Sequence, residues 1–242
     1  MQLAATGADT EWGGLLSSVA EQLKVPLTII ARQAELSLLT GQQGDASNQL
    51  VRTQADAALQ LVDSYLLGLE LLRLQAPLEL EPVSVSSTLV DTAHTLTKFA
   101  QQYNVDVEVE VGGRYEPVMA HARGLRAALL SLGFGLVEAQ AAAPEGTKRR
   151  RLVLATHRTP HGIITGVYGM GDAVNAAQWR TALSLLGRAP QPFTGLSAGT
   201  GAGLFVADTI FRGMASQLRV GLWQRQRGLA ATLQPSKQLQ FV

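Results

Sequence analysis

Apolar residues near the start of the chain recur at the spacing of an amphipathic helix. Two series seven residues apart form a heptad-like seam: Leu16, Leu23 and Ile30, with Ala20, Leu27 and Ala34. This pattern predicts a helix from about residue 15 to residue 40, with the seam turned inward. Gly41 and Gly44 are expected to end the helix, and the small and polar residues 1–12 are expected to form a loose end.

A second segment follows the pattern more strictly and is predicted to form another helix. Its apolar residues alternate in steps of four and three: Val51, Ala55, Ala58, Val62, Tyr65, Leu69, Leu72 and Ala76. Further leucines widen the stripe beyond what one partner helix covers: Leu59, Leu66, Leu67, Leu71 and Leu74. We therefore expect two helical hairpins to pair as a dimeric four-helix bundle. The alternative is that the rest of the same chain covers the surplus apolar surface.

Beyond Pro77 and Pro82 the periodicity switches between helix and strand. The predicted helices are 85–103, 122–141, 174–186 and 203–213, with a glycine- and proline-rich loop at 187–201. The predicted strands are 105–111, 151–156, 163–168, 217–224 and 228–234. Helices mixed with antiparallel strands in this way predict an α+β two-layer sandwich. The expected domains are a helical hairpin at 1–78 and a sandwich domain at 79–242.

The composition of the chain argues against several kinds of partner and site. Lys and Arg number 20 against 19 Asp and Glu, a net charge of +1, so no nucleic-acid partner is expected. The absence of cysteine excludes disulfides, thiolate metal sites and cysteine nucleophiles. His157 and His161 have metal-pair spacing, but Pro160 argues against the helix they would need, so no metal site is expected. No apolar run is long enough to span a membrane, which favours a soluble, cytoplasmic protein without membrane insertion.

One segment of the first helix resembles a known motif. Residues 21–28, Glu-Gln-Leu-Lys-Val-Pro-Leu-Thr, resemble the phosphoacceptor motif His-Glu-Leu-Arg-Thr-Pro-Leu-Thr of bacterial sensor histidine kinases. Residues 78–83 resemble the segment joining that family's two domains, and residues 228–235 resemble its closing strand. Two glycine-rich stretches resemble its nucleotide-binding glycine boxes: Gly169 and Gly171 in the first, and Gly199, Thr200, Gly201, Gly203 and Leu204 in the second. The resemblance implies a phosphoacceptor-like dimerisation hairpin followed by an ATPase domain.

The residues that carry the family's phosphoryl transfer are replaced in this chain. Glu21 stands where the family has its phosphoacceptor histidine, and a carboxylate cannot form the phosphoramidate of that chemistry. Gln22 stands where the family has an acid that acts as general base, and an amide cannot accept the proton. The resemblance therefore implies a degenerate, pseudokinase-like member that does not autophosphorylate.

The implied nucleotide site also departs from the family. Ser131 and Gly135 stand at the positions of two asparagines, the second of which helps to hold magnesium, and Val167 stands where an aspartate reads adenine. ATP and Mg²⁺ are thus expected to bind weakly or not at all. If a nucleotide does bind, Val167→Asp is expected to strengthen the binding of adenine over guanine nucleotides. The second glycine box can still offer backbone N–H groups to an anion, or can serve only as a turn retained for packing. His121 is expected to be a surface or capping residue.

These departures favour a non-catalytic signalling protein, a dimeric scaffold or partner-binding module of two-component type. Its expected partner face is Glu21, Lys24 and Thr28, which share one side of the first helix. The resemblance implies that a response-regulator receiver domain, or another signalling protein, docks there. The alternative is an enzyme: an ATP-binding histidine kinase or an ATPase with a rearranged nucleotide site.

Overall fold

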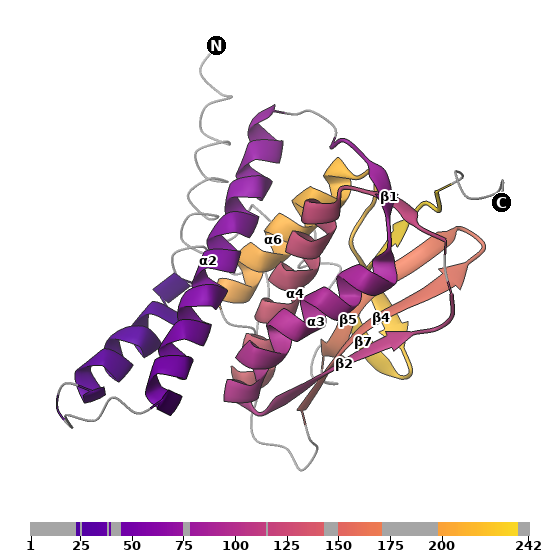
Figure 1. The fold of residues 1–242 in the computed structure, drawn as a ribbon. Coiled ribbons are helices and arrows are strands. Elements are labelled where there is room, and N and C mark those ends of the chain that lie inside the picture. Colours follow the sequence, from indigo (N-terminus) through magenta and orange to yellow (C-terminus); the bar gives the residue numbers. More distant parts are fainter. Residues whose placement is uncertain are drawn as a thin grey trace.

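A helical hairpin packed on a two-layer α/β unit makes up the computed structural model, which describes residues 23–24, 26–37, 39, 45–74, 78–114, 116–142, 150–170 and 198–236 (Figure 1). The described residues between 23 and 39 are helical. The further helices are α2 (Asp45–Leu74), α3 (Val85–Ala100), the 3₁₀ turn η1 (Gln101–Tyr103), α4 (Ala122–Ala142) and α6 (Ala198–Gly213). The strands are β1 (Glu81–Val83), β2 (Val105–Val111), β3 (Val118–Ala120), β4 (Arg150–Thr159), β5 (Gly162–Met170), β6 (Arg219–Trp223) and β7 (Gln226–Leu233).

The main sheet has five strands in the order β2-β4-β5-β7-β6. Neighbouring strands are antiparallel except β2 and β4, which run parallel with Val105 opposite Arg150. The expectation of antiparallel strands is therefore wrong for this pair. The chain returns from β2 to β4 through helix α4, and such a crossover brings the second strand back in the same direction as the first.

Two short strands were not predicted. β1 and β3 form a separate antiparallel pair, with Pro82 opposite Met119. Each strand has three residues, too few to show an alternating pattern, and proline is a poor strand residue. The predicted loop at 187–201 is also wrong at its end, because α6 already begins at Ala198. The predicted helix at 174–186 lies outside the described residues.

Helices α3, α4 and α6 cover one face of the main sheet, and α2 lies on the side of α4 and α6 that faces away from it (Figure 1). Leu61 and Tyr65 of α2 are buried in the same apolar core as the α/β unit. Gly68 allows close approach to α6, because a Cβ placed there would lie 3.3 Å from a methyl group of Val206. For this side of α2 the structure follows the alternative expectation, in which the rest of the chain covers the hairpin.

The opposite face of the sheet carries a cluster of aromatic side chains. The rings of His157 and Trp223 stack with centroids 5.0 Å apart, and Tyr168 lies beside them. The indole N–H of Trp223 donates to Glu110 at 2.6 Å, and Arg151 pairs with the same carboxylate. His157 therefore has a structural contact of its own, because its ring stacks on Trp223.

Candidate functional site

The expected partner face is exposed where the structure describes it. Lys24 and Thr28 are exposed on the first helix, and the Thr28 hydroxyl donates to the Lys24 carbonyl at 2.7 Å. Glu21 and Gln22 lie outside the described residues. Leu27 was expected to point into the seam of the dimeric bundle; in the single chain its side chain is 55% exposed, and its burial in a dimer stays a prediction. The face therefore combines polar groups with an apolar one.

Side-chain hydrogen bonds fix the register of the two hairpin helices. The Gln33 amide donates to the Ser47 hydroxyl at 2.7 Å, and the Ser37 and Ser47 hydroxyls lie 3.2 Å apart. With the helices held in this register, five leucines of the hairpin remain more than half exposed: Leu27, Leu36, Leu39, Leu59 and Leu66. We call them the leucine surface. The hairpin thus keeps a substantial apolar surface that the rest of the described chain leaves open.

The positions that the resemblance assigns to magnesium and adenine are closed by protein. Ser131 and Gly135 are buried on α4, and the Ser131 hydroxyl has no hydrogen-bond partner in the structure. Val167 on β5 is 0% exposed, and its cross-strand neighbours Leu154 and Leu229 are equally buried. These residues supply neither a carboxylate for an adenine amino group nor a second side-chain ligand for a metal ion.

Helix α2 covers this side of α4. Ser131, Gly135 and Glu138 follow one another in steps of four and three and so share one face of the helix. Glu138 lies close enough to Tyr65 of α2 for its charge to raise the pKa of that phenol. Phe134, on the same side, lines a groove together with residues of α2. The face that would meet a nucleotide in the family meets the hairpin in this chain.

In the first glycine box, backbone conformation and packing by themselves require a glycine at position 169. Gly169 has φ +141°, and a Cβ there would lie 2.4 Å from the carbonyl oxygen of Arg151. The Gln140 amide on α4 donates to the carbonyls of Gly169 at 2.6 Å and Arg151 at 3.1 Å. Glycine is therefore required by this positive φ and by the close approach to β4, at the point where the pairing of β5 with β7 is bulged, with or without a ligand. Gly171 lies outside the described residues.

The second glycine box belongs to the body of a helix. Gly199, Thr200 and Gly201 fall in the first turn of α6, whereas they were expected to precede it. Gly203 and Leu204 are buried within the same helix. Tertiary packing outweighs the low helix propensity of glycine here. The structure brings Gly203 and Leu204 into the core beside α4.

His121 has a defined structural role. Its ring Nδ1 accepts the backbone N–H of Gly124 at 3.0 Å, three residues into α4, and the backbone N–H of His121 donates to the sulfur of Met214 at 3.4 Å. A side chain that accepts a backbone N–H in the first turn is a helix N-cap. The capping assignment of His121 is therefore confirmed.

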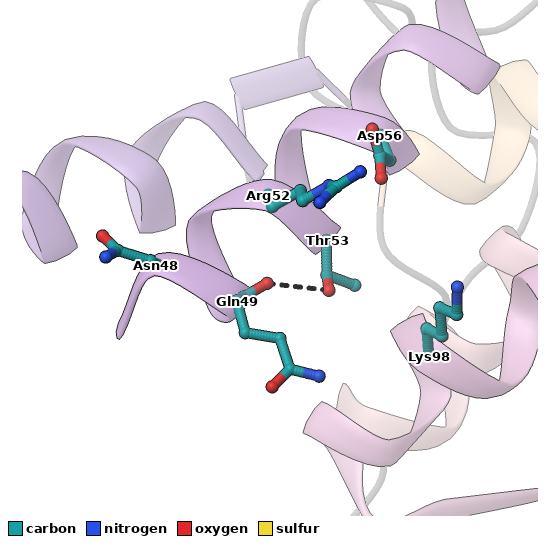
Figure 2. Close-up of a pocket in the computed structure, with 6 residues that line it drawn as sticks. All are labelled: Asn48, Gln49, Arg52, Thr53, Asp56 and Lys98. Atoms are coloured by element: carbon teal, nitrogen blue, oxygen red, sulfur yellow. Dashed lines mark hydrogen bonds between the residues drawn. The ribbon is translucent and has the colours of Figure 1, made fainter. Parts of the chain in front are cut away.

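A groove between α2 and α3 was not predicted. It has a volume of about 500 Å³, and Figure 2 shows Arg52 and Asp56 on its α2 side with Lys98 opposite on α3. In the part of the chain that the structure describes, no ion pair joins these three side chains. The groove joins segments more than forty residues apart, so no local pattern indicates it.

The least expected group is Glu138. This carboxyl is 7% exposed, and burial raises its pKa to about 8. Tyr103 in η1 faces it as well, and burial together with the charge of Glu138 raises the pKa of Tyr103 to about 12. The sequence shows only an acid near the end of an apolar helix, and helical spacing alone cannot show that both neighbouring elements would enclose it.

Comparison with known proteins identifies the fold. No family model matches the sequence, and no curated protein matches it significantly. The chain aligns with the Acinetobacter baumannii histidine kinase AdeS at 15% identity and a TM-score of 0.51, over 90% of this chain and 98% of that one. It aligns with full-length ShkA in complex with AMPPNP at 16% identity and a TM-score of 0.52, over 90% of this chain and 46% of that one.

The hairpin and the α/β unit therefore have the fold of bacterial histidine kinases. The likeness concerns the fold, and the residues at each site decide the chemistry. Among the described helices, none has the length and apolarity needed to cross a membrane.

Proposed function

We propose that this chain is a non-catalytic histidine-kinase-like protein, a dimeric scaffold or partner-binding module in two-component-type signalling. The observation that carries the proposal is Val167, a fully buried valine at the position where the resemblance calls for an adenine-reading aspartate, in a chain with the histidine kinase fold. The replacement of the phosphoacceptor and base positions by Glu21 and Gln22 supports the same conclusion.

The residues present do not fit Mg-ATP as the family binds it. An adenine amino group needs an acceptor, and Val167 offers methyl groups. A magnesium ion needs oxygen ligands, and Gly135 has no side chain. Losing one hydrogen bond to a charged acceptor costs about 1.5–3 kcal/mol, which is roughly 10- to 150-fold in affinity. A scaffold role needs neither contact.

The partner surfaces of the proposed scaffold lie on the hairpin. The leucine surface is suited to a second copy of the chain, because burying apolar area is what drives stable self-association. The flank with Lys24 and Thr28 carries a charge and a hydroxyl, which suits a reversible contact with a receiver domain or another signalling protein. Glu21 extends this flank in the sequence.

The purified chain is expected to incorporate no label from γ-labelled ATP, because the nucleophile and the base are both absent. The measurement is retention of phosphate after alkali and its loss after acid, the signature of a phosphohistidine.

Calorimetric titration with Mg-ATP is expected to give a dissociation constant in the high-micromolar range or weaker. Tight, magnesium-dependent binding would instead favour the alternative, an enzyme with a rearranged nucleotide site.

The chain is expected to sediment as a dimer at micromolar concentration, and Leu66→Glu is expected to shift it toward monomer. Leu66 is exposed in the single chain, so the charge should change the monomer's free energy of unfolding by less than about 0.5 kcal/mol. The matched control is Leu222→Glu, at a leucine of β6 that is exposed to a similar extent. Sedimentation that is the same for the wild type and for Leu66→Glu would remove the leucine surface from the proposal.

A further inference from the structure

The contact between α2 and the α/β unit contains buried polar groups. Gln54 of α2 is buried, and its amide donates to the side-chain oxygen of Gln102 in η1, while its own oxygen has no partner in the structure. Ser64 is 3% exposed and returns its hydrogen bond to the Gln60 carbonyl of the same helix. Polar groups and an open groove at one end are typical of interfaces that separate, whereas a permanent core is apolar.

Glu138 lies at this contact, near Tyr65 of α2 and Tyr103 of η1. In the described part of the chain, the titratable groups that face it are two phenols, Tyr65 from α2 and Tyr103 from η1. Within the described residues, no lysine, arginine or histidine of α3, α6 or the sheet forms an ion pair with it. Among the described residues, a carboxylate at this place would therefore lie buried between two phenols without a compensating cation, which is strongly unfavourable.

We propose that the protonation of Glu138 decides whether α2 remains packed on α4 and α6: the neutral acid holds the hairpin in place, and the carboxylate releases it.

The direction of the pH dependence follows from linkage. The packed state binds the Glu138 proton more tightly than the released state, in which separation of α2 opens the carboxyl to water. Since the pKa is about 8 in the packed state against an ordinary value of 4.5, each rise of one pH unit between these values should weaken packing by up to about tenfold. Above pH 8 both states are ionised, and the dependence should level off.

The absence of cysteine allows a direct test in the full chain. Ser64→Cys places one nearly isosteric thiol on the covered side of α2, and Glu70→Cys places one on its exposed side. The rates of labelling by a thiol reagent are measured from pH 6 to 9. Their ratio cancels the ionisation of the thiol and reports the released fraction. A third probe, Ala155→Cys, is buried in the sheet and reports unfolding of the whole chain.

The ratio of Ser64→Cys to Glu70→Cys labelling is expected to rise by up to tenfold per pH unit to about pH 8, while labelling at Ala155→Cys stays slow. Adding Glu138→Gln should make the ratio independent of pH. A constant ratio in the parent chain would overturn the proposal, and this result needs no substitution of Glu138. An identical rise in Glu138→Gln, or a parallel rise at Ala155→Cys, would also overturn it. If Glu138→Gln does not fold, Glu138→Leu supplies the second uncharged variant.

Discussion

Val167→Asp is expected to lower the free energy of unfolding by about 3–5 kcal/mol at neutral pH, the usual cost of an uncompensated buried charge. Val167 is fully buried on the helix-facing side of β5, between Leu154 and Leu229. The described ion pairs involve Arg151 and Arg212 with other carboxylates, so none of them supplies a cation for the introduced aspartate. A domain of ordinary stability has about 5–15 kcal/mol in total, so this loss is severe. Adenine could reach the new carboxylate only if a pocket opened at this place, which the side chains of Val167, Leu154 and Leu229 now fill.

Urea unfolding at pH 5 and pH 8, followed by circular dichroism, measures the effect. Burial raises the pKa of an introduced carboxyl, so the loss at Val167→Asp should be smaller at pH 5, where more of the acid is neutral. The matched control is Val167→Asn, which adds a polar group of the same size without a charge and should show no such pH dependence. A Val167→Asp chain that is as stable as the wild type and melts higher with Mg-ATP would show that the site opens.

Regular periodicity accounts for what the sequence predicted well. The strand 105–111 agrees with β2, because valine and acidic side chains alternate without interruption. The helices α2 and α4 were found from apolar repeats over several turns. The short strands β1 and β3 carry no such repeat, and the parallel pairing of β2 with β4 depends on the path of the chain between them.

Periodicity shows which residues share a face, and it does not show what covers that face. Leu27 belongs to the heptad seam by spacing, yet it is exposed in the chain. Tyr65 belongs to the second seam, yet it packs on the α/β unit. Glu138 was missed for the same reason, because its surroundings come from α2 and η1 rather than from its own helix. For Gly169 the sequence offered only a resemblance, while its φ of +141° and its close approach to the carbonyl oxygen of Arg151 depend on the folded chain.

Glu138→Gln is expected to raise the free energy of unfolding at pH 8–9 by about 4–5 kcal/mol, as an upper bound from the shift of its pKa to about 8. The sign follows from proton binding. The folded state holds the proton more tightly than the unfolded state, so the contribution of Glu138 to stability is fully present below pH 4.5. It is lost as the pH rises from there to about 8. An uncharged glutamine removes this loss, and its amide is expected to reduce the gain by about 1 kcal/mol if it remains unpaired.

Urea unfolding between pH 4 and 9 measures both the gain and the slope, with the exposed carboxyl Glu70→Gln as the control that should leave the slope unchanged. The measured stability profile also distinguishes two responses to ionisation of Glu138: α2 stays packed over the charged group, or α2 is released. If α2 stays packed, the stability of the wild type should fall by about 1.4 kcal/mol per pH unit from about pH 4.5 to about pH 8. If α2 is released first, the fall can be no larger than the free energy of packing α2, and the curve should flatten below pH 8. A wild-type profile parallel to that of Glu138→Gln would mean that water or a neighbouring group solvates Glu138 in the folded chain.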